Sequence, residues 1–296
     1  MLCDSHIHFI PKELSVHTSF YKGAWTDSKA LCGFLDKYSI EKALLVYPST
    51  DAHLKLKSRK EACSIYNKAA SGLMLKDKRI VAAGIIDVTD IDAICPQLEE
   101  LKEKGLKGLS IASSYEGRFI IENIKVVFKQ AYKHNLFVFV HPQTLNPIGF
   151  ERVKDPLLMP VLEYSFDISM LLGLLMMEGL LKDCKAKIIF SSLGGVTAFL
   201  KDRFDRVYMM LRKRDLVKDL SQLPSQLLKN VYVDTSGSSL ENIQLAMDLF
   251  GEDKILWGSD YPVNINVEEN LKLFDKLKEE ERKKIIYENL MRLLEQ

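Results

Sequence analysis

The chain has 296 residues, of which 47% are hydrophobic and 27% are charged, a composition typical of a globular protein with a sizeable core. Its 41 basic and 40 acidic side chains leave a formal net charge of +1. This balance disfavours nucleic acid and acidic membrane surfaces as partners. The five cysteines lie far apart and form no C-x-x-C pair, so neither a disulfide framework nor a zinc ribbon is indicated. With no secretory signal at the N-terminus, we expect a cytoplasmic protein.

Short apolar runs alternate with longer helical patterns along the chain. Most runs are continuously apolar, which is typical of parallel strands that are covered on both faces. The expected strands are residues 2–9, 42–48, 79–86, 106–112, 136–142, 186–192, 230–236 and 254–260. Apolar periodicity with stop and cap signals predicts helices that include residues 90–105, 122–135, 239–251 with Ser239 as N-cap, and 279–296.

Eight strands that alternate with helices predict an α/β fold, a single (β/α)8 barrel over residues 1–296. The alternative is an open doubly wound sheet, which would carry a glycine-rich phosphate turn after its first strand, and HIHFIPKE is no such turn. Three connections are long enough to cover a site, namely 9–26, 142–160 and 213–229. The most apolar segment, 168–177, is too short to span a bilayer and is expected to form a buried helix.

Three histidines and one aspartate fall where expected strands end. His6 and His8 are two residues apart on the first strand and therefore point the same way, while His141 ends the fifth strand and Asp260 the eighth. Because a barrel has its active site at the C-terminal ends of its strands, we expect these side chains to converge. Imidazole and carboxylate ligands suit zinc, our first choice, and also manganese, nickel or iron(II). Such a metal would activate water or polarise a substrate oxygen, and Asp260 would move the proton.

Each of these residues also has an ordinary structural interpretation. An H-x-H pair is a weak signal, His141 alone is typical of a core or loop histidine, and Asp260 alone is compatible with a helix N-cap. The metal site is favoured because all four residues fall at the ends of only three strands. Of the other histidines, His17 and His53 are weaker candidates for the site, and His134 is expected to be solvated near a helix end.

Three further residues are candidates for binding a small-molecule substrate. Arg118 follows the fourth expected strand and could hold a substrate carboxylate through a bidentate pair. Tyr21 and Trp25 lie in the first long connection and could line or cap a pocket. The alternatives are a surface ion pair for Arg118 and simple loop packing for the two aromatic residues.

Five motifs resemble those of the amidohydrolase superfamily, in matching order: DSHIHF, FVFVHP, KIIFSSLGG, NVYVDTSG and ILWGSDYPV. They are most similar to the amidohydrolase-related (amidohydrolase 2) branch, which contains aminocarboxymuconate semialdehyde decarboxylase and γ-resorcylate decarboxylase. The resemblance runs from residue 4 to about 293. It implies a barrel enzyme with metal ligands at His6, His8, His141 and Asp260 and, by analogy with relatives, a homodimer.

Two features depart from the superfamily. Some of its branches bridge two metals with a carboxylated lysine at the end of strand four, but this strand ends GLSIASS, so we expect a single metal ion. The family usually reads H-x-G-G after strand six, and counting back from Gly194 and Gly195 places Ser192 where that histidine would stand. A serine hydroxyl can orient water but is neither an acid nor a base near neutral pH.

The sequence therefore predicts a metal-dependent hydrolase that acts on a small polar, carboxylate-bearing molecule through a metal-activated water. Asp260 and Ser192 are the expected catalytic residues. One alternative is a non-oxidative decarboxylase or a hydratase of the same family. Another is a metal-binding barrel that has lost catalysis, an interpretation that Ser192 makes credible.

Overall fold

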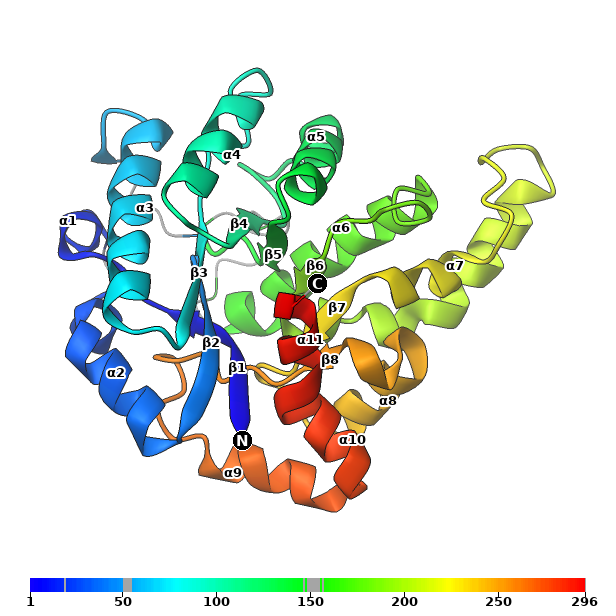
Figure 1. Ribbon diagram of the computed structural model, residues 1–296. Coiled ribbons are helices and arrows are strands. Elements are labelled where there is room, and N and C mark those ends of the chain that lie inside the picture. Colours follow the sequence, from blue (N-terminus) through cyan, green and yellow to red (C-terminus); the bar gives the residue numbers. More distant parts are fainter. Residues whose placement is uncertain (19, 50–54, 146, 148–154, 156, 296) are drawn as a thin grey trace.

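Eight parallel strands form one sheet in sequence order, from β1 to β8 (Figure 1). The structure is a computed structural model that describes residues 1–18, 20–49, 55–145, 147, 155 and 157–295. The strands are β1 Leu2–His8, β2 Ile40–Val46, β3 Ile80–Gly84, β4 Gly108–Ala112, β5 Phe137–His141, β6 Ile188–Phe190, β7 Tyr232–Asp234 and β8 Ile255–Leu256. All eight expected strands are present, and the predicted (β/α)8 barrel is confirmed.

The barrel closes between β1 and the segment that follows β8. Because β8 is only two residues long, the loop after it continues the contact with β1. Ser5 N–H donates to the Trp257 carbonyl at 2.8 Å, and His8 N–H donates to the Tyr261 carbonyl at 2.7 Å. Asp260 N–H donates in turn to the carbonyl of His6 at 2.9 Å. The chain therefore completes the barrel with residues 257–261, beside the C-terminal half of β1.

Helices surround the sheet (Figure 1). They are α1 Lys12–Ser15, α2 Ser28–Lys37, α3 Arg59–Lys76, α4 Ile94–Glu103, α5 Ile121–Lys133, α6 Tyr164–Met177, α7 Thr197–Arg212, α8 Leu240–Phe250, α9 Glu268–Leu273, α10 Glu279–Lys283 and α11 Asn289–Glu295. Ser239 caps α8 as predicted, because its side chain accepts from Asn242 N–H. The single helix expected over 279–296 is divided into α10 and α11 by a π-helical turn at Lys284–Glu288.

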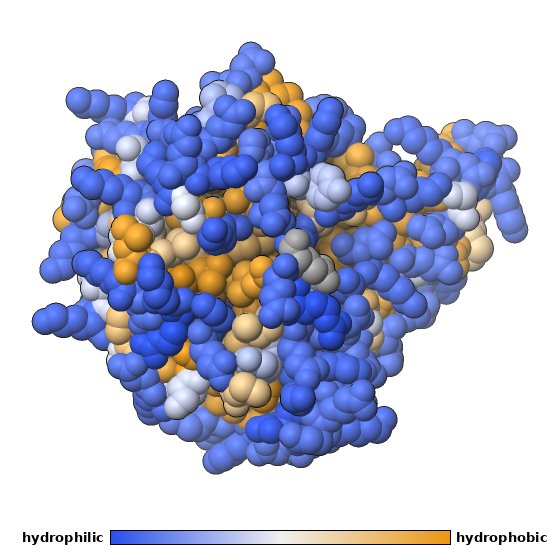
Figure 2. All heavy atoms as spheres, in the orientation of Figure 1, coloured by the Kyte–Doolittle hydropathy of each residue, from blue (hydrophilic) through white to orange (hydrophobic). Residues whose placement is uncertain are grey.

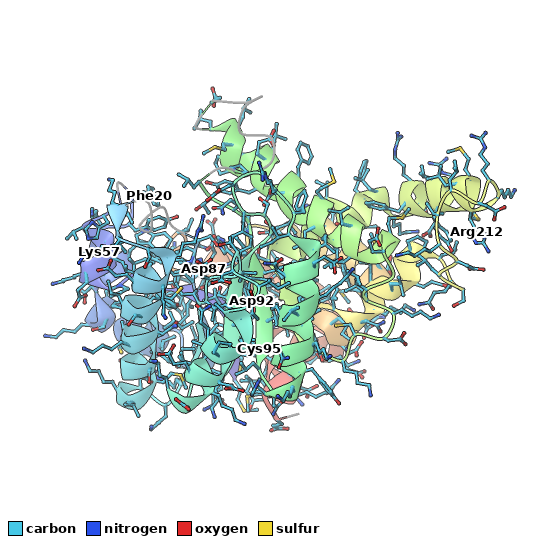
Figure 3. The ribbon with its side chains drawn as sticks, turned by 90° about the horizontal axis from the view of Figure 1, so that it is seen from above. Phe20, Lys57, Asp87, Asp92, Cys95 and Arg212 are labelled. Carbon is cyan, nitrogen blue, oxygen red and sulfur yellow. The ribbon has the colours of Figure 1, made fainter. Side chains whose placement is uncertain are left out.

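One of the three long connections lies away from the expected site. Residues 213–229 lead from α7 into β7, and such a connection enters its strand at the N-terminal end, opposite the active-site face of a barrel. Helix α7 extends outward from the barrel, and Arg212 lies at its outer end (Figure 3). The expectation that this connection covers the site is therefore wrong.

Helix α6 is longer than the apolar segment that signalled it. A π-helical turn at Met159–Glu163 precedes it, and the continuous helix Met159–Met177 is long and apolar enough to cross a membrane by length and composition alone. The expectation that this segment is too short to span a bilayer therefore does not hold for the whole helix. Half of this helix is buried within the protein, including Ile168, Leu172 and Met176, so the expected core helix is present.

The helix Met159–Met177 and the residue before it carry exposed apolar side chains. They recur at every fourth residue, at Leu158, Leu162, Phe166 and Met170, and Phe199 at the start of α7 is 82% exposed. Figure 2 shows apolar side chains beside α6 and α7 and also toward the centre of the same face, with hydrophilic side chains around them. A contiguous exposed apolar surface commonly marks an interaction site. The homodimer suggested by analogy with relatives stays a prediction.

A substitution at Gly258 tests how tightly residues 257–261 pack against β1, the contact that closes the barrel and is called the seam below. A Cβ at this buried glycine would lie 2.9 Å from the Cβ of His6 and 3.3 Å from that of Asp234. We expect Gly258→Ala to lower the free energy of unfolding by about 1–3 kcal/mol, as overpacked core positions do. Gly33→Ala is the matched control, because no atom lies within 4 Å of a Cβ there on the exposed side of α2. Equal stability of the two variants in denaturant titrations would contradict this packing.

Candidate metal centre

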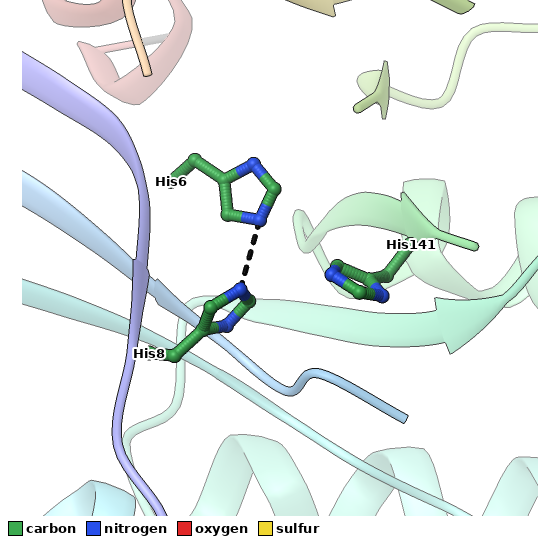
Figure 4. A group of neighbouring side chains, drawn as sticks. All are labelled: His6, His8 and His141. Carbon is green, nitrogen blue, oxygen red and sulfur yellow. Dashed lines mark hydrogen bonds between the residues drawn. The ribbon is translucent and has the colours of Figure 1, made fainter. Parts of the chain in front are cut away.

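Three buried imidazoles converge inside the C-terminal mouth of the barrel (Figure 4). His6 and His8 point to the same side of β1, and His141 is the last residue of β5. One ligand nitrogen from each ring lies within 4.8 Å of the others. The distance between His6 Nε2 and His8 Nε2 is 3.0 Å. The predicted convergence of the three histidines is therefore present in the fold.

Each imidazole is held by an oxygen acceptor at its Nδ1 atom. His6 Nδ1 faces Asp234 Oδ2 at 2.8 Å, His8 Nδ1 faces the Val46 carbonyl at 2.9 Å, and His141 Nδ1 faces the Pro142 carbonyl at 2.9 Å. A carbonyl oxygen can only accept, so the proton of the neutral ring sits on Nδ1 in His8 and His141. Their Nε2 atoms then carry free lone pairs, the form that binds a metal.

Asp260 completes the group from the loop after β8. Its Oδ1 lies 3.1 Å from His8 Nε2 and 3.6 Å from His6 Nε2, and 31% of the side chain is exposed. The sequence suggested a position at the tip of the eighth strand, but β8 ends at Leu256, and Asp260 has a φ of 61°. Its N–H bond to the His6 carbonyl, and not the strand, places this carboxylate beside the imidazoles.

The donor set fits a divalent cation. Two lone-pair nitrogens 3.0 Å apart in a buried site repel each other unless a cation or proton lies between them. Three imidazoles and one carboxylate are ligands that zinc, manganese, nickel and iron(II) accept. We therefore assign His6, His8, His141 and Asp260 as the residues that would hold one metal ion.

The four groups have different proton affinities. Burial opposes charging of His6, but the negative charge and hydrogen bond of Asp234 outweigh it and raise the pKa of His6 to about 9. Burial lowers the pKa of His8 and, more strongly, that of His141, and the positive charge of His6 acts in the same direction. Burial would raise the pKa of Asp260, but the charge of His6 and the hydrogen bond with His8 hold it below its usual value.

Asp234 is a functional residue that the sequence analysis missed. It ends β7, is fully buried and orients His6 through the Nδ1 contact. A carboxylate behind a ligating histidine fixes the ring and raises its basicity. Asp234 stands in the quoted motif NVYVDTSG, so the strand-end argument that found Asp260 would also have found it.

A second buried carboxylate, Asp4, fixes the backbone at the seam. Its Oδ1 accepts from His6 N–H and Ser259 N–H, each at 3.0 Å, and so ties β1 to the segment after β8. Burial raises the pKa of Asp4 to about 7 despite these hydrogen bonds. Asp4 therefore joins the two segments that carry metal ligands.

A cavity of about 1250 Å³ opens above the four ligands. Its walls are mostly apolar and include Phe20, Tyr21 and Trp25 from the first long connection, and Phe20 lies at the edge of the molecule in Figure 3. The Trp25 ring stacks on His8 with centroids 5.5 Å apart, and Tyr21 packs edge-on against Trp25 at 4.7 Å. The expectation that 9–26 covers the site and that Tyr21 and Trp25 line it agrees with this geometry.

The other candidate residues have different places. Ser192 lines the cavity, whereas Arg118 is exposed on a hairpin after β4 and is absent from the cavity wall. Its role as a carboxylate clamp stays a prediction that the geometry does not favour. His17 does not line the cavity, and His53 lies outside the described residues. His134 ends α5 half-buried, not fully solvated as expected, and its Nε2 has no partner among the described residues.

Fold and site together define a barrel with a candidate mononuclear metal centre at its mouth. A family model for amidohydrolases matches residues 3–295, and the chain therefore belongs to the amidohydrolase family. This finding confirms the resemblance that the motifs suggested.

Similar solved structures cover nearly the whole chain. The 5-carboxyvanillate decarboxylase from Sphingomonas paucimobilis has 14% sequence identity and a TM-score of 0.85, with 99% of this chain and 98% of that one covered. The corresponding enzyme from Novosphingobium aromaticivorans, complexed with manganese and a nitrobenzoic acid, has 20% identity and a TM-score of 0.85 over 100% and 96%. A 2,6-dihydroxybenzoate decarboxylase from Rhizobium has 18% identity and a TM-score of 0.79 over 100% and 99%. At these identities the likeness establishes the fold.

Replacing Asp234 tests its support of His6. In Asp234→Asn, the amide can turn its NH₂ group toward His6 Nδ1, which then loses its acceptor, or toward the N–H groups of Ser192 and Ser236, which then lose theirs. Either arrangement weakens the hold on the His6 ring that metal binding needs. We expect the affinity for manganese or zinc to fall about 10–100-fold. Titration against a competing chelator measures this loss. Asp202→Asn on the exposed side of α7 is the control, and equal affinities of the two variants would contradict the role of Asp234.

Proton competition at His6 predicts how metal affinity depends on pH. Because its pKa is raised to about 9, His6 of the metal-free protein carries a proton on Nε2 at neutral pH, and that proton must leave before a metal binds. The pKa values of His8 and His141 are lowered, so these rings do not compete. We expect affinity to rise about tenfold per pH unit from pH 6.5 to 8.5. A constant affinity over this range in chelator-buffered titrations would contradict a protonated His6.

Proposed function

We propose that the protein is a metal-dependent non-oxidative decarboxylase of an aromatic or similarly flat, apolar carboxylic acid. The observation that carries the proposal is the cavity, in which a polar floor of three imidazoles and Asp260 lies beneath mostly apolar, aromatic walls. The names of the similar structures, which are decarboxylases of substituted benzoates, support the same chemistry. The hydrolase expected from the sequence receives less support.

The charge distribution limits where an anionic substrate group can bind. Among the residues that the structure describes, no lysine or arginine lines the cavity. The carboxylate of a substrate therefore belongs at the floor, where a bound divalent cation would attract it and polarise its oxygens. The body of the substrate then lies against Tyr21 and Trp25, where an aromatic ring can stack or pack edge-on.

Asp260 is placed to move the proton that decarboxylation requires. It is the partly exposed member of the group and faces the cavity, whereas the three imidazoles are buried. An anionic substrate at the floor would offset part of the positive charge beside Asp260 and so raise the pKa of its carboxyl above its value in the substrate-free site. Asp260 then donates this proton to the carbon that bears the carboxylate; that C–C bond breaks, its electron pair stays on the carbon, and CO₂ leaves.

Hydrolysis on the same floor would use Asp260 differently, as the base that takes a proton from water. Hydrolysis also requires a proton for the leaving group, and because Ser192 cannot provide one near neutral pH, Asp260 would have to return the proton that it took from water. Decarboxylation needs only one proton and no leaving-group acid. The decarboxylases among the similar solved structures support this reaction over the hydrolase and hydratase alternatives.

The metal itself is proposed as one divalent ion. Zinc was the first choice from the ligand types, and manganese is supported by the similar decarboxylase structures that contain it. Both ions accept the three imidazoles and the carboxylate. Activity should therefore be assayed with each ion in turn.

Replacing Asp260 tests the proposal. We expect manganese- or zinc-loaded protein to release CO₂ from hydroxybenzoates, and in D₂O to place one deuteron on the carbon that carried the carboxylate. In Asp260→Asn, kcat should fall about 10²–10⁴-fold, because the positioned proton donor is lost. Mass spectrometry of the product and metal analysis of both proteins separate loss of the proton donor from loss of the ion.

Two other outcomes would contradict the decarboxylase. Hydrolysis of esters or lactones without CO₂ release would identify a hydrolase on the same floor. Metal-loaded protein that turns over neither class would point to a binding barrel. Asp202→Asn is the matched control for Asp260→Asn and should keep the wild-type activity, because this exposed side chain lies outside the cavity wall.

A further inference from the structure

A chain of polar groups leads from the cavity to the side chain behind His6. Asp234 Oδ1 accepts from Ser192 N–H at 3.0 Å, from Ser236 N–H at 2.9 Å and from the Ser236 hydroxyl at 2.6 Å. The hydroxyl oxygens of Ser192 and Ser236 lie 3.2 Å apart. Both serines line the cavity, and Ser236 is 3% exposed.

The proton of Ser236 has only one place in this arrangement. Two backbone N–H groups already point at Asp234 Oδ1, and an N–H group can only donate, so this oxygen acts as a hydrogen-bond acceptor. The conclusion holds whichever partner keeps the proton between His6 Nδ1 and Asp234 Oδ2. The Ser236 hydroxyl must therefore donate to Oδ1, and its own oxygen remains as an acceptor.

The direction of the next hydrogen bond follows from the first. A hydroxyl has one proton, and that of Ser236 is used by Asp234. In the contact between the two serines, Ser192 must then be the donor. Its oxygen has no second proton to offer, so Ser192 presents only acceptor lone pairs to the cavity.

The backbone holds Ser192 in this place. Ser192, Leu193 and Gly194 have φ values of 50°, 55° and 69°, a left-handed turn that non-glycine residues rarely adopt. The bond from Ser192 N–H to Asp234 fixes the start of this turn. The preceding Ser191 is fully buried, lines the same cavity, and its hydroxyl has no partner among the described residues. A buried hydroxyl at a cavity wall can be satisfied by a water, an ion or a ligand that enters the cavity.

We propose that Ser192 is a specificity-determining residue that accepts a hydrogen bond from a neutral hydroxyl or amine of the substrate. The inference rests on the proposed function for the rest of the substrate, which is a flat acid with one carboxylate at the metal centre. Ser192 selects acids that carry a hydrogen-bond donor and disfavours those that carry only an acceptor or a second carboxylate there. It is neither an acid nor a base in the reaction.

Neutron diffraction from deuterium-exchanged, manganese-loaded crystals tests the hydrogen-bond direction without any substrate. We expect the Ser192 deuteron on the line to the Ser236 oxygen, and the Ser236 deuteron on the line to Asp234 Oδ1. A Ser192 deuteron that points into the cavity would overturn the proposal. Because this measurement does not depend on turnover, its result is independent of whether the protein decarboxylates.

Ligand pairs test the consequence for binding. The probes are 2-, 3- and 4-hydroxybenzoate, each compared with its methoxy counterpart, and affinity is measured by calorimetry on manganese-loaded protein. For each pair we take the ratio of the affinity for the hydroxy acid to the affinity for the methoxy acid. In at least one pair this ratio should be about 3–10-fold higher in the wild type than in Ser192→Ala, the factor that corresponds to one hydrogen bond. Ser64→Ala on the exposed side of α3 is the control and should keep the wild-type ratio.

Ser236→Ala provides the sharper variant, because it frees the Ser192 proton. Ser192 can then donate to an ether oxygen, so the preference for the hydroxy acid should shrink or reverse, whereas a purely structural role of Ser236 would weaken both probes equally. Wild-type and Ser192→Ala ratios that agree in all three pairs would overturn the proposal. If the deuterons lie as expected and the ratios shift but no CO₂ is released, the proposed reaction fails while this inference stands.

Discussion

The site depends on three hydrogen bonds that fix which nitrogen of each imidazole faces the centre. Asp234, the Val46 carbonyl and the Pro142 carbonyl hold the Nδ1 atoms of His6, His8 and His141. Without them the rings could rotate or change tautomer, and their Nε2 lone pairs would not meet. Two of the three acceptors belong to the backbone at the ends of β2 and β5, so the barrel itself supplies part of the ligand geometry.

Closure of the barrel and assembly of the site are the same event. The segment 257–261 bonds to β1 because β8 is short, and these bonds bring Asp260 beside His6 and His8. Asp4 is anchored to both sides of the same seam. A change that opens the seam would therefore remove a ligand as well as destabilise the fold, which couples the stability of the protein to its metal affinity.

The convergence of the histidines could be predicted from the sequence, because the prediction needs only the apolar pattern of the strands and the polar residues at their ends. Buried parallel strands are continuously apolar, so His6, His8 and His141 stand out where those strands end. Asp234 was missed although it lies near the end of an expected strand, where the same argument would have found it. Ser236 was missed because it acts on another side chain, and such a contact has no signature in the local sequence. Asp260 was found although its position depends on a left-handed loop residue beyond the strand, which periodicity cannot predict. The side chain of Arg118 was assigned by its place after a strand, but the hairpin turns it outward to solvent.

The replacement at position 192 has a physical meaning once the polar chain behind it is known. A histidine there would bring an acid–base group to a cavity in which Asp260 is the proposed proton carrier. Serine keeps the backbone bond to Asp234, and in the proposed arrangement it can only accept from a ligand, because its hydroxyl donates its single hydrogen bond to the Ser236 oxygen. In this proposal, Ser192 distinguishes a neutral donor group from a neutral acceptor group, and the metal centre binds the charged carboxylate. The proposed roles place substrate recognition after β6 and β7, at Ser192 and Ser236, and proton transfer after β8, at Asp260.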